Sequence, residues 1–178
     1  DDFFGEIVSI SGDYAIVGSM GDDTYKGGAY IFTRVTDTTW TKQKIVADIR
    51  VNNDQFGNSV SLSGDYAIVG ASSGNYAYIF TRNGTNWTQQ QKLVSTDTNF
   101  NPNDNFGYSV AISGDYAIVG APYSDASVYP PINDSGSAYI FKRSGNTWYE
   151  KAKFIPDNTQ SDDFFGEIVS ISGDYAIV

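Results

Sequence analysis

The sequence contains no cysteine and no histidine among its 178 residues. The chain therefore has no thiol nucleophile, no imidazole base and no zinc site of the usual kind. No apolar run approaches the 18 residues of a membrane-spanning helix, so we expect no membrane insertion. Basic residues are also scarce: 11 of them against 21 acidic residues give a net charge of −10, which excludes nucleic acid as an expected partner.

Features of a catalytic site are missing as well. No acid–base pair or nucleophile arrangement repeats along the chain or stands apart from its surroundings. Scattered carboxylates occur in every acidic protein and do not indicate hydrolysis. We therefore expect a protein that is not an enzyme and that needs no cofactor.

A repeated motif dominates what is present. The heptapeptide SGDYAIV occurs at Ser11–Val17, Ser63–Val69, Ser113–Val119 and Ser172–Val178. A Phe-Gly pair precedes each copy at a constant offset, at residues 4–5, 56–57, 106–107 and 165–166. The string AYIF follows at residues 29–32, 77–80 and 138–141, and a polar segment then begins at Trp40, Trp87 or Trp148. Co-registered blocks of this kind indicate an internal structural repeat.

Each repeat unit predicts four strands. Residues 56–63 alternate apolar and polar side chains with a period of two, and Gly64-Asp65 then suits a two-residue hairpin turn. YAIVG and AYIF are apolar enough to be buried on both faces, whereas the Trp-led segment is polar, as an edge strand should be. Together with 15% aromatic residues and 18 glycines, this pattern predicts an all-β fold.

The predicted architecture is a set of β-propeller-like blades, each a four-stranded antiparallel sheet with the Phe-Gly strand innermost. The expected blades span residues 1–53, 54–103 and 104–162, and residues 163–178 supply the first two strands of a fourth. Tyr14, Tyr66 and Tyr116 should pack between blades, while the three tryptophans should cover the outer edge.

The string ISGDYAIVGAP after Phe106-Gly107 resembles the FG-GAP repeat of integrin α-subunit propellers and of many bacterial surface proteins. The resemblance covers essentially the whole chain. It implies a propeller-type fold and an extracellular or cell-surface location. Calcium-binding members of that family carry a DxDxDG-type loop where this sequence has Ser-Gly-Asp-Tyr. Each such turn holds one carboxylate, too few oxygens for a calcium ion, so no metal is expected there.

Other loops contain weaker candidates. Asp97, Asn99 and Asn101 alternate in a connector as calcium ligands do, although such residues also form turns without an ion. The loop between the second and third strands varies most between units, and in the third unit it offers a ligand-binding surface for a surface protein or glycan. Its candidate residues are Tyr123, Asp125, Tyr129 and Asp134. Asparagine sequons at Asn83, Asn86 and Asn133 permit glycosylation.

The aspartates just before each Phe-Gly pair are expected to have a structural role instead. Asp2, Asp54, Asp104 and Asp163 should fix their loops by accepting hydrogen bonds from backbone amides.

Residues 1–17 are identical to residues 162–178, whereas the intervening copies differ. This indicates either a natural tandem array with a 161-residue period or an engineered overlap. The chain opens on Asp1 and ends inside a motif, so we expect a segment of a longer or processed protein. Three blades are too few to close a ring, which should leave Val8, Ile10, Ile16 and their equivalents in the last unit without a neighbouring sheet.

Two functions remain open at this point. The first is a self-assembling structural element, such as a filament, superhelix or tandem array, whose partners are copies of itself or the continuation of its own chain. The second is a closed propeller that acts in adhesion by binding a protein or glycan. The terminal identity favours the first, and the family resemblance favours the second.

Overall fold

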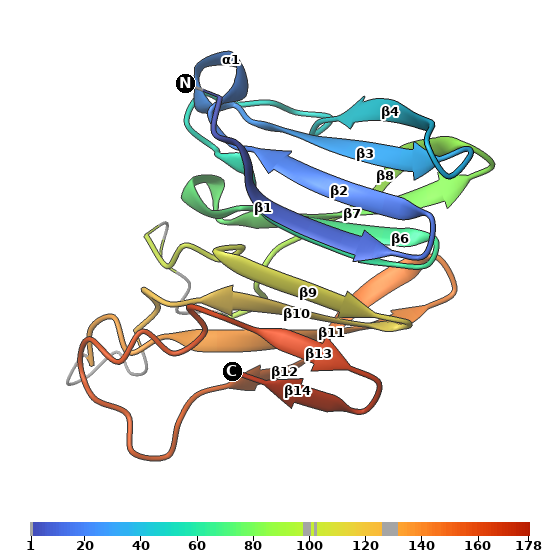
Figure 1. Ribbon diagram of the computed structural model, residues 1–178. Coiled ribbons are helices and arrows are strands. Elements are labelled where there is room, and N and C mark those ends of the chain that lie inside the picture. Colours follow the sequence, from blue (N-terminus) through green and yellow to red (C-terminus); the bar gives the residue numbers. More distant parts are fainter. Residues whose placement is uncertain (1, 98–100, 102, 126–131) are drawn as a thin grey trace.

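The chain forms a stack of antiparallel sheets in the computed structural model, which describes residues 2–97, 101, 103–125 and 132–178 (Figure 1). Sheet 1 has the order β1 (Phe4–Ser11), β2 (Tyr14–Ser19), β3 (Gly28–Arg34) and β4 (Trp40–Ile45). Sheet 2 has the order β5 (Phe56–Ser63), β6 (Tyr66–Ala71), β7 (Tyr76–Asn83) and β8 (Asn86–Leu93). Sheet 3 has the order β9 (Ser109–Ser113), β10 (Tyr116–Ala121), β11 (Ser137–Ser144) and β12 (Thr147–Phe154).

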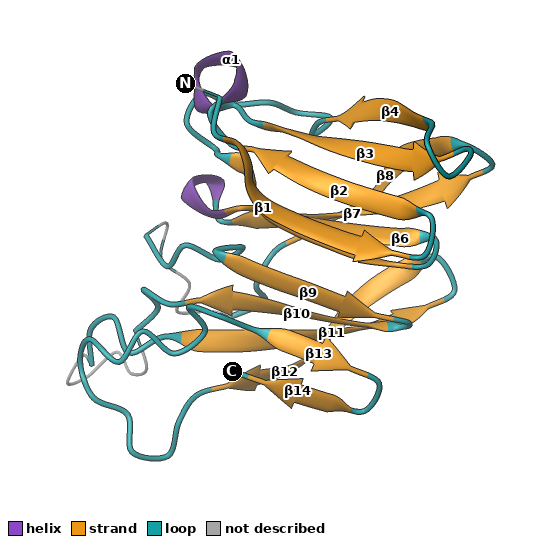
Figure 2. Ribbon diagram, in the orientation of Figure 1, coloured by secondary structure: helices purple, strands orange, loops and turns teal. Residues whose placement is uncertain are grey.

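The last element is a two-stranded hairpin of β13 (Ser170–Ser172) and β14 (Tyr175–Ile177), called the terminal hairpin below. It lies against sheet 3 at the opposite end of the stack from sheet 1 (Figure 1). Helical structure among the described residues is limited to the turns α1 (Asp22–Tyr25) and η1 (Ser72–Gly74) (Figure 2). The prediction of an all-β fold with propeller-like, four-stranded antiparallel blades is confirmed.

Local sequence explains the strand boundaries. Gly64 has a φ of 57° in the turn between β5 and β6, a conformation that glycine adopts without a Cβ penalty. The predicted two-residue turn is therefore confirmed. Sheet 3 differs slightly from expectation, because its first strand begins at Ser109, so Phe106 and Gly107 lie before it.

Two hydrophobic layers hold the three complete sheets together. Between sheets 1 and 2, Ile16, Ile31 and Ile45 pack against side chains of sheet 2, including Val60 and Val69. The layer between sheets 2 and 3 repeats this arrangement. Ile68, Ile79 and Leu93 of sheet 2 pack against side chains of sheet 3, including Val110 and Val119. Sheet 2 thus uses one face to meet sheet 1 and the other face to meet sheet 3.

One predicted exposure is wrong. Val8 and Ile10 are 61% and 71% exposed, as expected, but Ile16 is fully buried. Ile16 pairs with Ser9 in the ladder between β1 and β2, whereas Val8 pairs with Val17. Side chains alternate between the two faces of a sheet, so Ile16 points toward sheet 2 and Val8 points away from it.

Candidate interaction surface

A recurring aromatic contact lies in each joint, as we call the interface between two consecutive sheets, and connects the second strand of one sheet to the fourth strand of the next. The rings of Tyr14 in sheet 1 and Trp87 in sheet 2 lie 5.8 Å apart in an edge-to-face arrangement. Tyr66 in sheet 2 and Trp148 in sheet 3 repeat this contact, also at 5.8 Å. The prediction that Tyr14 and Tyr66 pack between blades is confirmed, and Trp87 and Trp148 lie in the same joints rather than only covering the edge.

Arginine completes the same joint. The Arg82 guanidinium lies 4.8 Å from the centre of the Tyr14 ring, and Arg143 lies 4.8 Å from that of Tyr66. Each arginine also forms an ion pair with the aspartate of its own Ser-Gly-Asp-Tyr turn, Asp65 or Asp115. The turn carboxylate therefore holds an arginine in place over a ring of the preceding sheet.

Glutamine adds hydrogen bonds to each joint. The Gln43 side chain donates to the Trp87 carbonyl at 2.8 Å and accepts from the Trp87 amide at 2.9 Å. Gln91 forms the same pair of bonds with Trp148, both at 2.8 Å. In sheet 3 the equivalent position, opposite the same isoleucine of the third strand, is Ala152. A joint formed beyond sheet 3 therefore lacks this pair of bonds.

The Ser-Gly-Asp-Tyr turns are also linked along the stack. The hydroxyl oxygens of Ser11, Ser63 and Ser113 each accept a hydrogen bond from the turn glycine amide of the next unit, at 3.3, 3.0 and 3.1 Å. The last of these bonds reaches Gly173 in the terminal hairpin. The terminal hairpin is therefore seated on sheet 3 as the complete sheets are seated on one another.

A close backbone approach further restricts the joints. Gly107 has a φ of 95°, and a Cβ at this position would overlap the carbonyl oxygen of Tyr76 in the preceding unit. Gly5 has nearly the same φ of 92°, but an added Cβ there would meet nothing within 4 Å. Gly5 thus has the same backbone conformation as Gly107, but no other unit of the described structure lies against it.

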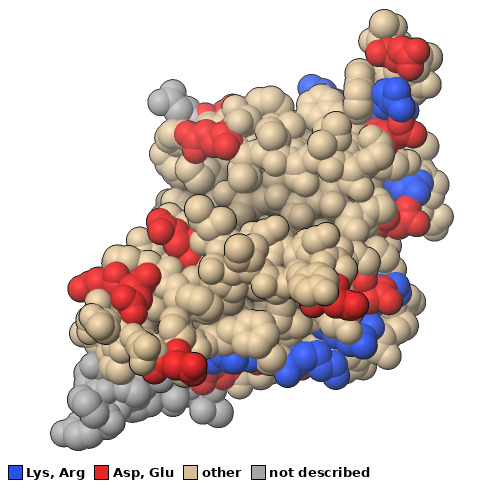
Figure 3. Space-filling model, turned by 60° about the horizontal axis from the view of Figure 1, so that its bottom comes forward, with Lys and Arg blue, Asp and Glu red and all other residues tan. Residues whose placement is uncertain are grey.

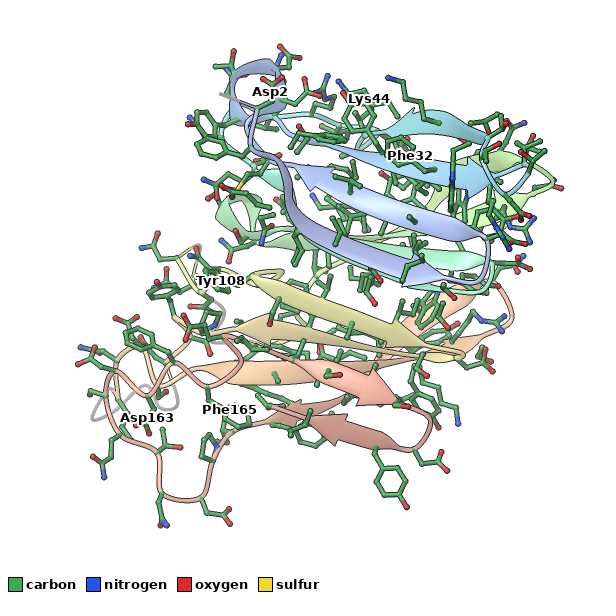
Figure 4. All side chains as sticks on the ribbon, viewed as in Figure 1. Asp2, Phe32, Lys44, Tyr108, Asp163 and Phe165 are labelled. Carbon is green, nitrogen blue, oxygen red and sulfur yellow. The ribbon has the colours of Figure 1, made fainter. Side chains whose placement is uncertain are left out.

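The free face of sheet 1 carries the residues that sheets 2 and 3 bury. We call it the upper face, and it comprises Phe4, Val8, Ile10, Val17, Phe32 and Trp40. Trp40 is 42% exposed, whereas Trp87 and Trp148 are each 2% exposed. Phe32 and Lys44 lie at this end of the stack, and Asp163 and Phe165 lie at the other (Figure 4).

The opposite end of the stack is partly open. A pocket of about 350 Å³ lies between sheet 3 and the terminal hairpin; we call it the lower pocket, and it is lined by Tyr116, Ile140, Phe154, Ile171 and Tyr175 among others. Phe154 is 42% exposed, whereas its equivalents Ile45 and Leu93 are 3% and 1% exposed. Viewed from this end, the centre of the surface is mainly uncharged, with acidic and basic side chains along its margins (Figure 3).

The candidate ligand-binding loop is partly engaged in packing. The Tyr123 ring lies 5.4 Å from that of Phe164 and 6.2 Å from that of Tyr108. Asp125 accepts a hydrogen bond from the Asp134 amide at 3.1 Å, so these two candidates are brought together. Tyr129 lies outside the described residues.

The candidate metal-binding residues Asp97 and Asn101 contact other groups of the protein. Asp97 pairs with Lys153 at 2.5 Å, and the described ranges contain no group of three or more His, Cys, Asp or Glu side chains placed to hold a metal ion. Asn101 donates its amide to the Asp104 carboxylate at 3.0 Å, while Asn99 lies outside the described residues. Burial raises the pKa of Asp104 to about 6.

The loop-fixing role predicted for the aspartates before Phe-Gly is borne out by Asp104 and Asp163, whose carboxylates accept backbone amides. The three sequon asparagines, Asn83, Asn86 and Asn133, are all exposed. Asn83 and Asn86 pair with each other at the turn between β7 and β8. Exposure is compatible with the glycosylation that the sequons permit.

Sequence reasoning missed the arginines and glutamines of the joints. The sequence contains a signal for the arginines, because IFTR, IFTR and IFKR place Arg34, Arg82 and Arg143 at the same position of the third strand in each unit. The glutamines give a weaker signal, since Gln43 and Gln91 occur in a polar strand that resembles a solvent-facing edge.

Comparison with known proteins agrees with this architecture. The family described as FG-GAP repeat matches residues 1–32, 40–80, 87–141 and 148–178. No curated protein matches the sequence. No helix in the described part of the chain is long and apolar enough to cross a membrane.

Proposed function

Because the chain belongs to the FG-GAP repeat family, whose β-propeller-type repeats are generally non-catalytic and typical of extracellular proteins, we propose that it is an extracellular structural element that assembles with copies of itself. In this role its sheets stack end to end, and the upper face of one copy meets the sheet 3 end of another. The contact joins unlike ends, so it produces a ring or a filament according to the rotation at each joint.

The upper face of sheet 1 carries this proposal. Its apolar positions match, one by one, positions that sheets 2 and 3 bury against the sheet before them. Val8 and Ile10 are 61% and 71% exposed, whereas their equivalents Val60 and Leu62 are 5% and 6% exposed. The same chain therefore shows twice what covers such a face, namely the isoleucine-rich face of a preceding sheet.

Burial of this face is favourable in magnitude. Covering about 400 Å² of apolar surface contributes about 10 kcal/mol. Association costs roughly 4–15 kcal/mol in lost translational and rotational freedom. The apolar term is therefore of the size needed for association, and the tyrosine, tryptophan and arginine contacts of the joint add to it.

Sedimentation equilibrium of the purified chain tests the proposal. We expect oligomers at micromolar to tens of micromolar concentration, and Trp40→Lys should shift them to monomers by placing a charge on the part of the upper face that β4 contributes. Ile49→Lys is the matched control, because Ile49 is 77% exposed but lies outside the sheets. A chain that stays monomeric over this range, or equal effects of the two lysine variants, contradicts self-assembly through the upper face.

A further inference from the structure

We propose that copies are joined by strand exchange: the terminal hairpin of one copy takes the place of β1 and β2 in the next copy and pairs with its β3. The partner at the edge of β14 is therefore β3 of a second copy, followed by its β4. This inference rests on the proposed self-assembly and specifies its geometry.

The two hairpins are interchangeable in sequence and in register. Residues 162–178 repeat residues 1–17 without a difference. In the terminal hairpin, Ser170 pairs with Ile177 and Ile171 with Ala176. In sheet 1, the corresponding pairs are Ser9 with Ile16 and Ile10 with Ala15. The terminal hairpin thus already has the conformation that β3 recognises.

The edge that would accept β3 is open. β2 pairs with β3 over six residue pairs, from Tyr14–Thr33 to Ser19–Gly28, whereas β14 pairs with β13 alone within the described structure. Unpaired edges of this kind accept strands from other chains. Tyr175 and Ile177 are 83% and 70% exposed, so no described part of the chain covers the face of this hairpin that lies away from sheet 3.

The lower pocket lies where the outer strands of a completed sheet belong. Tyr116, one of its lining residues, is the equivalent of Tyr14 and Tyr66, which receive Trp87 and Trp148 in the internal joints. When β3 and β4 of a second copy extend the terminal hairpin, Trp40 and Arg34 come to the same position relative to Tyr116. Trp40 is 42% exposed and the Arg34 side chain is 44% exposed, so both groups are accessible for this contact.

The exchange conserves contacts. The contacts that residues 2–17 of the second copy lose with their own β3 and with sheet 2 are replaced by the same residues in the terminal hairpin of the first copy. Of the six β2–β3 pairs, the four from Tyr14–Thr33 to Val17–Tyr30 are replaced in this way, and the pairs of Gly18 and Ser19 are not. The additional contacts are those between the lower pocket and the outer strands of the second copy. Domain swapping of identical elements is a low-cost route to association for this reason.

Engineered disulfides test the exchange in a full-length chain that has no cysteine of its own. Tyr175→Cys and Thr33→Cys are made in separate chains and mixed, since Tyr14 and Thr33 are paired in sheet 1. Ala176→Cys with Phe32→Cys is a second mixture, because adjacent antiparallel pairs alternate between two geometries. Strand exchange is expected to yield a covalent dimer of twice the monomer mass under non-reducing conditions.

Two controls make the result interpretable. A single chain carrying Tyr14→Cys and Thr33→Cys should close an internal disulfide, which shows that sheet 1 folds and that the geometry permits the bond. A mixture of Thr33→Cys and Asn83→Cys chains measures collisional cross-linking, since Asn83 is exposed and lies in the β7–β8 hairpin.

The association state of each mixture is measured before oxidation. Oligomers that show cross-linking no higher than the Asn83 control overturn the exchange but leave the proposed self-assembly intact. Absence of oligomers overturns both. Ala152→Gln provides an independent check, because a glutamine there should bond the Trp40 backbone of the second copy and increase the yield of covalent dimer. An unchanged yield contradicts the placement of Trp40 in the lower pocket.

Discussion

Trp148 and Trp40 are chemically identical, occupy equivalent positions and differ in what covers them. Trp148 is 2% exposed and packs edge-to-face on Tyr66, whereas Trp40 is 42% exposed on the upper face of sheet 1. The indole nitrogen of Trp148 also donates a hydrogen bond to Gln90 at 3.2 Å. Replacement of each tryptophan by alanine therefore compares the stability contributed by a tryptophan buried between two sheets with that contributed by the same residue on an uncovered sheet.

The structure sets the expected magnitudes. Trp148→Ala removes a buried indole and leaves a cavity, which costs about 3–5 kcal/mol in the free energy of unfolding. Trp40→Ala removes a partly exposed side chain and should cost less than about 1 kcal/mol in the monomer. For a domain of this size, the Trp148 change corresponds to a fall in melting temperature of roughly 10 °C, whereas the Trp40 change shifts it by a few degrees at most.

Chemical denaturation followed by far-ultraviolet circular dichroism measures both variants without relying on tryptophan fluorescence. The experiment is carried out at submicromolar concentration, where we expect the chain to be monomeric, and is repeated at tens of micromolar. Trp40→Ala should then show a larger loss, because association buries Trp40. Equal losses for the two variants at the low concentration would refute the assignment of buried and open joints.

Three further predictions concern single positions. Burial raises the pKa of Asp104 to about 6, so near this pH the native state binds a proton that the unfolded chain releases, and stability falls as pH increases. The melting temperature should therefore rise on acidification from pH 7.5 to 5, and Asp104→Asn should reduce this rise. An unchanged pH profile in thermal melts of the variant would contradict this. Gly107→Ala should destabilise the chain more than Gly5→Ala in urea titrations, since a Cβ meets the Tyr76 carbonyl only at Gly107, and equal losses would count against the close approach. EDTA should leave the melting temperature unchanged because each Ser-Gly-Asp-Tyr turn offers one carboxylate, and a fall of several degrees would assign an ion to Asp97 and Asn101.

Strand order and turn positions could be predicted from the sequence because their signals are local. The period of two in residues 56–63 and the Gly64-Asp65 turn specify a hairpin without reference to any other part of the chain. The repeat then transfers this assignment to the other units, which explains why the sheet topology matches the prediction.

The faces of the sheets could not be predicted in the same way. The second strand is apolar at consecutive positions, so alternation does not tell which of Ile16 and Val17 meets the next sheet. The partners of Gln43 and Arg82 lie in neighbouring sheets, and no local pattern encodes a contact over that separation. The glutamines and arginines of the joints can therefore be identified only once the packing of whole sheets is known. Tyr14 and Tyr66 could be recognised from the sequence by their fixed place in an apolar strand.

The absence of a glutamine at position 152 has a mechanical consequence. Within each sheet the backbone hydrogen bonds run between strands, so a force along the stack loads the joints between sheets in series. Joints with Gln43 or Gln91 resist separation with two additional hydrogen bonds each. Under tension an assembled fibre should therefore yield first at the joint beyond sheet 3, while the exchanged terminal hairpin keeps neighbouring copies connected, so that this joint can close again when the load is removed.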